Sequence, residues 1–164
     1  MKPLLPLLAD KHFIVDCDYV LSETRDRSDK SHSQYFACAQ WAHDNLPEEM
    51  AEQLPDPEDL RAKALIATGY ATPRQFVARS NAEALKIAAF ISVYSGYRVI
   101  SIHENIVTEL QAKSQSYKAM GADEFKASKK DVIEYCAALI GVTVEALVKA
   151  SKADWEDRKQ RKAK

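Results

Sequence analysis

Alternation of apolar and polar residues predicts β-strands in several parts of the chain. In residues 12–20, HFIVDCDYV, every second residue from Phe13 to Tyr19 is apolar, and Asp16 and Asp18 fall on the opposite face. A period of two is typical of a half-buried strand. Shorter strands are expected at 74–79, 97–103 and 105–110.

Helical spacing and capping residues predict five helices. Asp56 followed by Pro57 places a capping carboxylate ahead of proline at the first helical position. Ser80 with Glu83, and Ser31 with Gln34, have the form of capping boxes. The expected helices run from about 33 to 46, from 57 to Gly69, from 80 to near Gly96, from Gly121 to Gly141, and from Thr143 into a basic tail that is expected to fray.

The order of these elements is strand, helices, strands, helices, which predicts an α+β fold with a small antiparallel sheet packed with helices. A chain of 164 residues fits one domain with an appended arm. We expect residues 1–142 to form the α+β domain and residues 143–164 to form a C-terminal helical arm with a basic tail.

Charge is distributed unevenly along the chain. The formal net charge is −1, but residues 1–60 hold 13 acidic and 5 basic side chains, whereas residues 61–164 hold 11 and 18. Seven of the acids lie within residues 44–59, which contain no Lys or Arg. This imbalance allows a face that binds a polyanion in spite of the near-neutral total.

The sequence also limits where the protein acts. Its longest apolar run is too short to cross a bilayer, and Pro3 and Pro6 interrupt the apolar start, so neither a membrane span nor a signal peptide is expected. Cys17, Cys38 and Cys136 are odd in number and form no Cys-x-x-Cys pair, which fits a reducing, cytoplasmic compartment.

The chain shows no motif of a known catalytic type. His32 and His43 would share a helix face but lie about 16 Å apart along it, too far to hold one zinc ion. The four glycines form no phosphate-binding loop. We therefore predict a non-enzymatic protein without metal or cofactor. A metal-dependent nuclease that uses Asp16 and Asp18 is the least favoured alternative.

Basic residues next to aromatic ones are the main binding signal. Single-stranded nucleic acid is held by cations along its backbone and by aromatic faces that stack on bases. Three groups fit this description. They are Arg25, Arg27 and Lys30 ahead of Tyr35, Phe36 and Trp41; Lys113, Ser114, Ser116, Tyr117 and Lys118; and the tail residues Arg158, Lys159, Arg161, Lys162 and Lys164.

The first two groups lie in segments that match a family pattern. RDRSDKSHSQYFA, residues 25–37, contains Arg-x-Arg-Ser, polar residues, and an aromatic residue followed by Ala. SQSYKAMGADEF, residues 114–125, contains Ser-x-Ser, Met and Glu-Phe, and the similarity continues to residue 142. In this order the segments resemble the phage NinB family, the Orf-type recombination mediators. The matched residues are Arg25, Arg27, Ser28, Phe36, Ala37, Ser114, Ser116, Met120, Glu124 and Phe125.

This resemblance implies a homodimeric phage or prophage protein that binds single-stranded DNA in the cytoplasm of a bacterial host. It would assist recombination through a single-strand-binding protein or a phage recombinase. Arg25, Arg27, Lys30, Lys113 and Lys118 would contact phosphate. Ser28, Ser114 and Ser116 would hydrogen-bond to the backbone, and Tyr35 or Tyr117 would stack on bases.

A protein-interaction module that captures a host or phage protein is the main alternative. Its expected contacts are the acidic segment 44–59 and the apolar face of the last helix.

Overall fold

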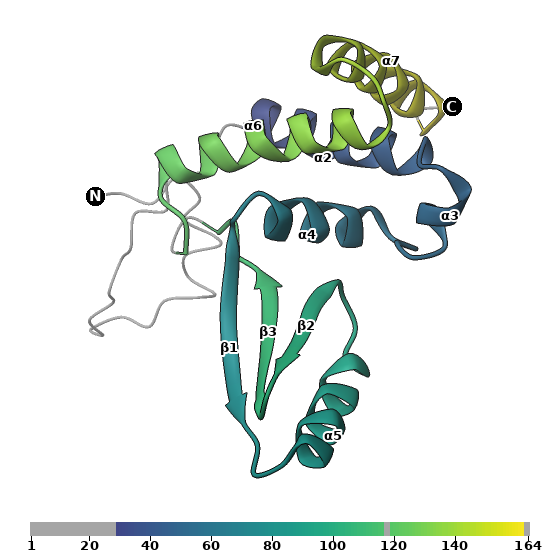
Figure 1. Ribbon diagram of the computed structural model, residues 1–164. Coiled ribbons are helices and arrows are strands. Elements are labelled where there is room, and N and C mark those ends of the chain that lie inside the picture. Colours follow the sequence, from purple (N-terminus) through teal and green to yellow (C-terminus); the bar gives the residue numbers. More distant parts are fainter. Residues whose placement is uncertain (1–28, 117–118, 163–164) are drawn as a thin grey trace, which may run out of the picture.

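The protein has an α+β fold in which a layer of helices lies above a small sheet (Figure 1). The computed structural model describes residues 29–116 and 119–162. The helices are α2 (Asp29–Asp44), α3 (Glu48–Ala51), α4 (Pro57–Ala67), α5 (Asn81–Ser92), α6 (Ala122–Leu139) and α7 (Val144–Lys162). The strands are β1 (Ala71–Val77), β2 (Arg98–His103) and β3 (Ile106–Ala112). The predicted fold class is confirmed, and the strand expected at 12–20 lies outside the described residues.

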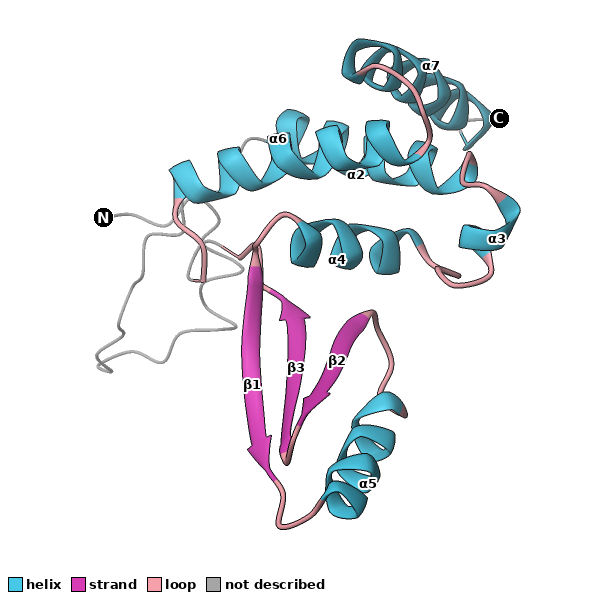
Figure 2. Cartoon of the chain, in the orientation of Figure 1, coloured by secondary structure: helices cyan, strands magenta, loops and turns pink. Residues whose placement is uncertain are grey.

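The sheet is antiparallel throughout and has the order β1-β3-β2 (Figure 2). Strands β2 and β3 form a hairpin in which His103 pairs with Ile106 across a two-residue loop, and Glu104 adopts a φ of 53° in that loop. Two-residue hairpin loops favour positive φ because their twist then matches that of the strands. The chain reaches β2 from β1 through α5, so the middle strand comes last.

Two separate groups of buried side chains hold the layers together. The larger core joins α2, α4, α6 and α7 and includes Cys38, Leu60, Leu65, Val132 and Leu147. The smaller core lies between α5 and the sheet and consists of Ala78, Ala84, Ile91 and Val107. The helical layer therefore has most of the buried apolar side chains, and the sheet and α5 have few.

Three predicted helix starts are confirmed by their capping hydrogen bonds. Asp56 Oδ1 accepts from the backbone N–H of Glu58 at 2.8 Å, and Ser80 Oγ accepts from Glu83 at 3.3 Å. Thr143 Oγ1 accepts from the backbone N–H of Ala146 at 3.2 Å. Each bond satisfies a donor that the first helical turn leaves without a partner.

The predicted start of α2 is wrong. The helix begins at Asp29 rather than near Ser33, so Ser31 lies inside the helix and is not its cap. Residues 29–34 contain neither glycine nor proline, and an acid such as Asp29 is favourable in a first turn. Nothing in the local sequence between Asp29 and Ser33 therefore excludes a helix.

Helix α7 continues to Lys162, so most of the tail that was expected to fray is helical. Its first half packs on α2: Leu147 is fully buried, and Cys38 Sγ lies 3.2 Å from Ser151 Oγ. Further along, Arg158 bonds to Asp154 in the same helix and to Asp44 in α2, both at 2.6 Å. These two contacts stabilise the last turns of α7 and connect them to α2 beyond the core.

Candidate nucleic-acid interface

The described parts of the two segments that resemble the phage family, residues 29–37, 114–116 and 119–142, lie together in the structure. Tyr35, in α2, donates its hydroxyl to Gln115 Oε1 at 3.1 Å, across 80 residues of sequence. The rings of His32 and Phe125 have centroids 5.8 Å apart, which joins α2 to the start of α6. These described parts therefore belong to one structural unit.

Gln115 is the centre of this contact. Its Oε1 also accepts from Arg61 Nη1 at 2.7 Å, and its Nε2 donates to Ser128 Oγ at 2.9 Å. Arg61 is itself paired with Glu58 at 2.6 Å. One side chain of the loop after β3 is thus bonded to α2, α4 and α6, and this fixes the loop against the helical layer.

The stacking role predicted for Tyr35 is wrong. The side chain is 1% exposed, so neither face of its ring is open to a base. Burial raises the pKa of Tyr35 to about 12, and its hydroxyl is already hydrogen-bonded to Gln115. Tyr35 is a core residue that positions the loop.

The other predicted contacts have different surroundings. Lys113 Nζ is paired with Glu124 Oε1, so a carboxylate already balances its charge. Ser114 and Ser116 are exposed, and their hydroxyl oxygens accept backbone bonds from Ser116 and Ala119 at 3.3 Å. Lys30 lies in the first turn of α2, but its side chain is not described. Arg25, Arg27, Ser28, Tyr117 and Lys118 lie outside the described residues.

A better placed aromatic side chain is Trp155 in α7. It is 41% exposed, and Lys159 Nζ lies 5.8 Å from the centroid of its ring. Two hollows of about 510 Å³ each flank it, and both are lined by Ala37, Trp155 and Lys159. Phe36, Gln40, Asp154, Arg158 and Arg161 complete one hollow, and Ser33, Gln34, Lys152 and Glu156 complete the other. We call this surface between α2 and α7 the α2–α7 face.

The cations of the α2–α7 face differ in whether a carboxylate is already paired with them. Arg158 is held between Asp44 and Asp154, and these hydrogen bonds raise the pKa of its guanidinium group. Lys152, Lys159 and Arg161 are exposed, and none of them forms an ion pair with another described residue. Three charges are therefore available to phosphate groups around one exposed aromatic ring.

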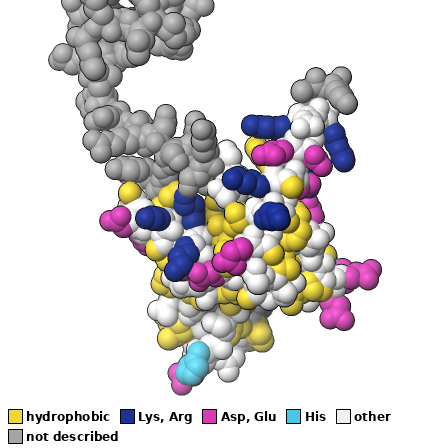
Figure 3. Space-filling view, turned by 90° about the horizontal axis from the view of Figure 1, so that it is seen from above, with side chains coloured by type: hydrophobic (Ala, Val, Ile, Leu, Met, Phe, Trp, Pro, Cys, Tyr) yellow, Lys and Arg dark blue, Asp and Glu magenta, His cyan; other side chains and the backbone are white. Residues whose placement is uncertain are grey.

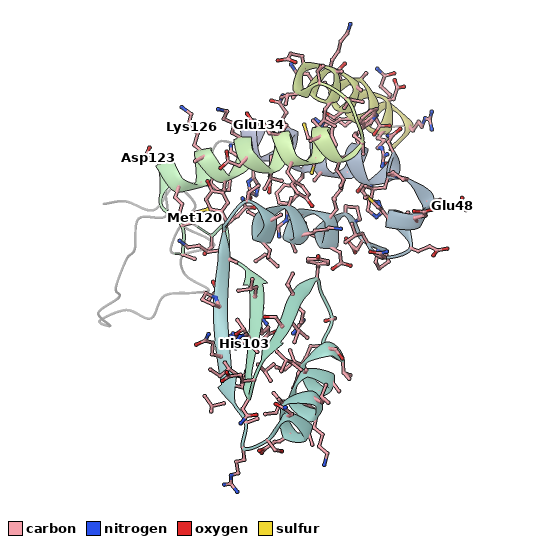
Figure 4. The ribbon with its side chains drawn as sticks, in the orientation of Figure 1. Glu48, His103, Met120, Asp123, Lys126 and Glu134 are labelled. Atoms are coloured by element: carbon pink, nitrogen blue, oxygen red, sulfur yellow. The ribbon has the colours of Figure 1, made fainter. Side chains whose placement is uncertain are left out.

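Viewed from above, the helical layer presents Lys and Arg side chains among hydrophobic and acidic ones (Figure 3). On α6 the charges are mixed: Lys126 and Glu134 extend from the same outer side of the helix (Figure 4), and Glu134 lies 3.7 Å from Lys130. The outer side of α6 therefore carries both charges, and part of its positive charge is paired within the helix.

The sequence of α7 contains a signal for this site. Lys152, Trp155 and Lys159 are spaced by three and four residues, which places them on one face of a helix. Trp155 also fits the apolar spacing of the last helix, so the sequence alone does not show whether its ring is buried. Its exposure depends on where α7 leaves the core, which no local pattern reports.

A third hollow, of about 750 Å³, lies between α5 and the sheet. Phe76, Phe90 and Tyr94 contribute aromatic rings to it, and Arg74 and Lys86 contribute cations. Its third cation is neutralised, because Arg98 Nη1 lies 2.9 Å from Glu109 Oε1 and Glu109 is 2% exposed. This groove is apolar and aromatic but has fewer available positive charges around each ring than the α2–α7 face.

Three groups with possible catalytic chemistry, His43, Cys38 and Cys136, are hydrogen-bonded or buried. His43 Nε2 is hydrogen-bonded to the carbonyl of Leu54 at 2.8 Å. Burial raises the pKa of Cys38 and raises that of Cys136 to about 12, and a thiol is nucleophilic only as a thiolate. Within residues 29–116 and 119–162, no three His, Cys, Asp or Glu side chains are grouped to hold a metal ion, and no helix there is long and apolar enough to cross a membrane.

Comparisons of the chain with protein-family models, with curated proteins and with solved structures found no match.

Proposed function

We propose that this protein binds single-stranded DNA through the α2–α7 face and acts without catalysis as an accessory factor in phage recombination. One observation supports the binding site: the half-exposed ring of Trp155 lies between two hollows and is flanked by Lys152, Lys159 and Arg161. The link to recombination comes from the resemblance of residues 25–37 and 114–142 to the phage mediator family.

Binding would combine stacking with charge neutralisation. A base stacks on Trp155, and the phosphates on either side lie against the lysine and arginine side chains. Stacking on an aromatic residue is tolerant of sequence because every base has a π-face. The resemblance adds Arg25 and Arg27, which precede α2 in the sequence, to the phosphate contacts. The remaining parts of the proposal are a homodimer in the bacterial cytoplasm and contact with a single-strand-binding protein or recombinase.

A titration of a fluorescein-labelled oligonucleotide of about 20 nucleotides, followed by anisotropy, tests the binding site. Trp155→Ala should weaken affinity by about 5- to 150-fold, because stacking of one base contributes about 1–3 kcal/mol. Phe90→Ala is the matched control, since Phe90 is an exposed aromatic residue in the groove beside α5. Far-UV circular dichroism of each variant checks that it is folded.

Two results would contradict the proposal. If wild-type protein does not bind the oligonucleotide at low salt, the proposal of DNA binding is wrong. Binding that is weakened by Phe90→Ala but not by Trp155→Ala would place the site in the groove beside α5 instead.

A protein-interaction module remains the second candidate, and a specific observation favours it. Of the ten large hydrophobic side chains that are exposed in the described residues, nine lie between Phe76 and Ile106. Exposed apolar patches of this kind mark surfaces that another protein covers. Binding to a purified single-strand-binding protein that is unaffected by the pair Arg25→Ala and Arg27→Ala, without binding to DNA, would favour this function.

The structure changes where such a module would make contact. Part of the acidic segment is used within the fold: Asp56 caps α4, Glu58 pairs with Arg61, and Asp59 Oδ1 accepts from the backbone N–H of Tyr97 at 2.9 Å. Glu48 extends into solvent from α3 (Figure 4). The apolar surface is instead on α5 and the neighbouring strands.

A further inference from the structure

Helix α5 is apolar on nearly every side, although it packs on the sheet with one side only. Its twelve residues, NAEALKIAAFIS, include four polar ones, and only Ala84 and Ile91 are buried. Leu85 is 63% exposed and Val93, directly after the helix, is 84% exposed. A helix that is hydrophobic all round is normally buried, so α5 has an apolar side that the described residues leave uncovered.

The uncovered side has a pattern that can pair with itself. Leu85, Ala89 and Val93 follow one another at intervals of four and form a stripe that contains no charge. If a second α5 lies antiparallel to the first with the crossing point at Ala89, Leu85 of each copy meets Val93 of the other. The small side chain at the crossing point allows the two backbones to approach closely.

The neighbouring strand offers a second contact on the same side. The sheet order is β1-β3-β2, so β2 is an edge strand, and no described strand pairs with its outer edge. The other edge strand, β1, contains Pro73, which lacks a backbone N–H, whereas β2 (RVISIH) contains no proline. Proteins protect edge strands with proline and charge because unpaired backbone groups attract another strand.

The two features are next to each other. Helix α5 lies beside β2, on the side of the sheet away from β1 (Figures 1 and 2). At about 3.6 residues per turn, the stripe lies on the side of the helix away from the buried Ala84 and Ile91. Phe90 and Tyr94 lie between these two sides and face the hollow over the sheet. A single partner can therefore cover the stripe and reach the free edge of β2.

We propose that α5 and β2 form the interface with a second copy of this chain, related by a two-fold axis that passes near Ala89. A two-fold axis brings the same surface of both copies together, so a surface that dimerises in this way must be complementary to itself. The stripe meets this requirement because its ends match in an antiparallel pairing and because it brings no like charges together. The inference deepens the dimeric part of the proposed function and does not depend on DNA binding.

Sedimentation equilibrium of the whole chain tests the dimer. Wild-type protein should have twice the monomer mass of 18.4 kDa at micromolar concentrations. Ala89→Glu should return the protein to the monomer mass by placing two carboxylates at the crossing point. Ala127→Glu, the same substitution at an exposed alanine of α6, should remain dimeric. Both variants should keep the far-UV spectrum of the wild type.

Disulfide cross-linking tests the position of the axis. In a Cys17→Ser background, Ala89→Cys should form a covalent dimer on mild oxidation, since a disulfide requires Cα atoms less than about 7 Å apart. Ala127→Cys should remain monomeric under denaturing, non-reducing conditions. The remaining thiols, Cys38 and Cys136, are buried.

The outcomes separate the interface from the proposed function. Wild-type protein that stays monomeric, or a dimer that survives Ala89→Glu, would overturn the proposed interface. Oligonucleotide binding by the same variants is measured in parallel. If Ala89→Glu is monomeric and still binds DNA, the proposed interface is supported and the α2–α7 face remains the DNA-binding site. If the wild type is a dimer that does not bind DNA, the proposed interface is supported and the proposed function is wrong.

Discussion

Raising the salt concentration should weaken DNA binding by an amount that the structure allows us to calculate. The α2–α7 face has three cations without a described ion-pair partner: Lys152, Lys159 and Arg161. Each cation that neutralises a phosphate releases counterions, and for single strands the slope of log K against log salt is about −0.7 per phosphate contact. Three contacts therefore predict a slope of about −2.

That slope corresponds to a loss of about 20-fold in affinity between about 50 and 200 mM salt. If Arg25, Arg27 and Lys30 also contact phosphate, six contacts predict a slope of about −4. The measured slope thus distinguishes a site confined to α7 from one that includes the segment before α2. Arg158 is left out of the count because Asp44 and Asp154 already hold it.

Anisotropy titrations of the labelled oligonucleotide at three or more salt concentrations measure the slope. Lys159→Gln should make it shallower by about 0.7, and Lys86→Gln, an exposed lysine of α5, should leave it unchanged. A slope near zero, or an equal effect of the two substitutions, would refute the reasoning, because binding would then not depend on the cations around Trp155.

Three further predictions concern the fold. Arg98→Met should lower the free energy of unfolding by about 3 kcal/mol, because it leaves the buried carboxylate of Glu109 without its cation, and adding Glu109→Gln should recover much of this loss in urea unfolding. The pKa of Tyr35 is raised from 10.0 to about 12, so the contribution of its neutral hydroxyl to the free energy of unfolding is complete below pH 10. This contribution is lost between pH 10 and 12, at about 1.4 kcal/mol per pH unit. The difference in unfolding free energy between wild type and Tyr35→Phe should therefore narrow over that range. Leu147→Ala, in the fully buried part of α7, should cost about 2–5 kcal/mol in the same urea assay, and a cost below about 1 kcal/mol would show that α7 does not share the main core.

Local chemistry was enough to predict most of the elements. The starts of α4, α5 and α7 depend on a side chain and a backbone N–H within three residues of each other, as at Asp56, Ser80 and Thr143. Gly69 and Gly141 end helices with φ of 91° and 70°, which glycine adopts without a steric penalty. The start of α2 was misplaced because its polar first turn contains no residue that forbids helix.

The candidate site was only partly predictable. The sequence by itself determined the α+β class and most of the helix and strand positions, and it placed basic residues near aromatic ones. Only the tertiary structure decided which aromatic ring is accessible. Tyr35 is covered because Gln115, 80 residues away, lies over its hydroxyl. Trp155 is exposed because α7 leaves the core after Ser151, whose partner Cys38 is 113 residues away. Burial depends on such distant contacts, whereas capping and periodicity depend on neighbours along the chain.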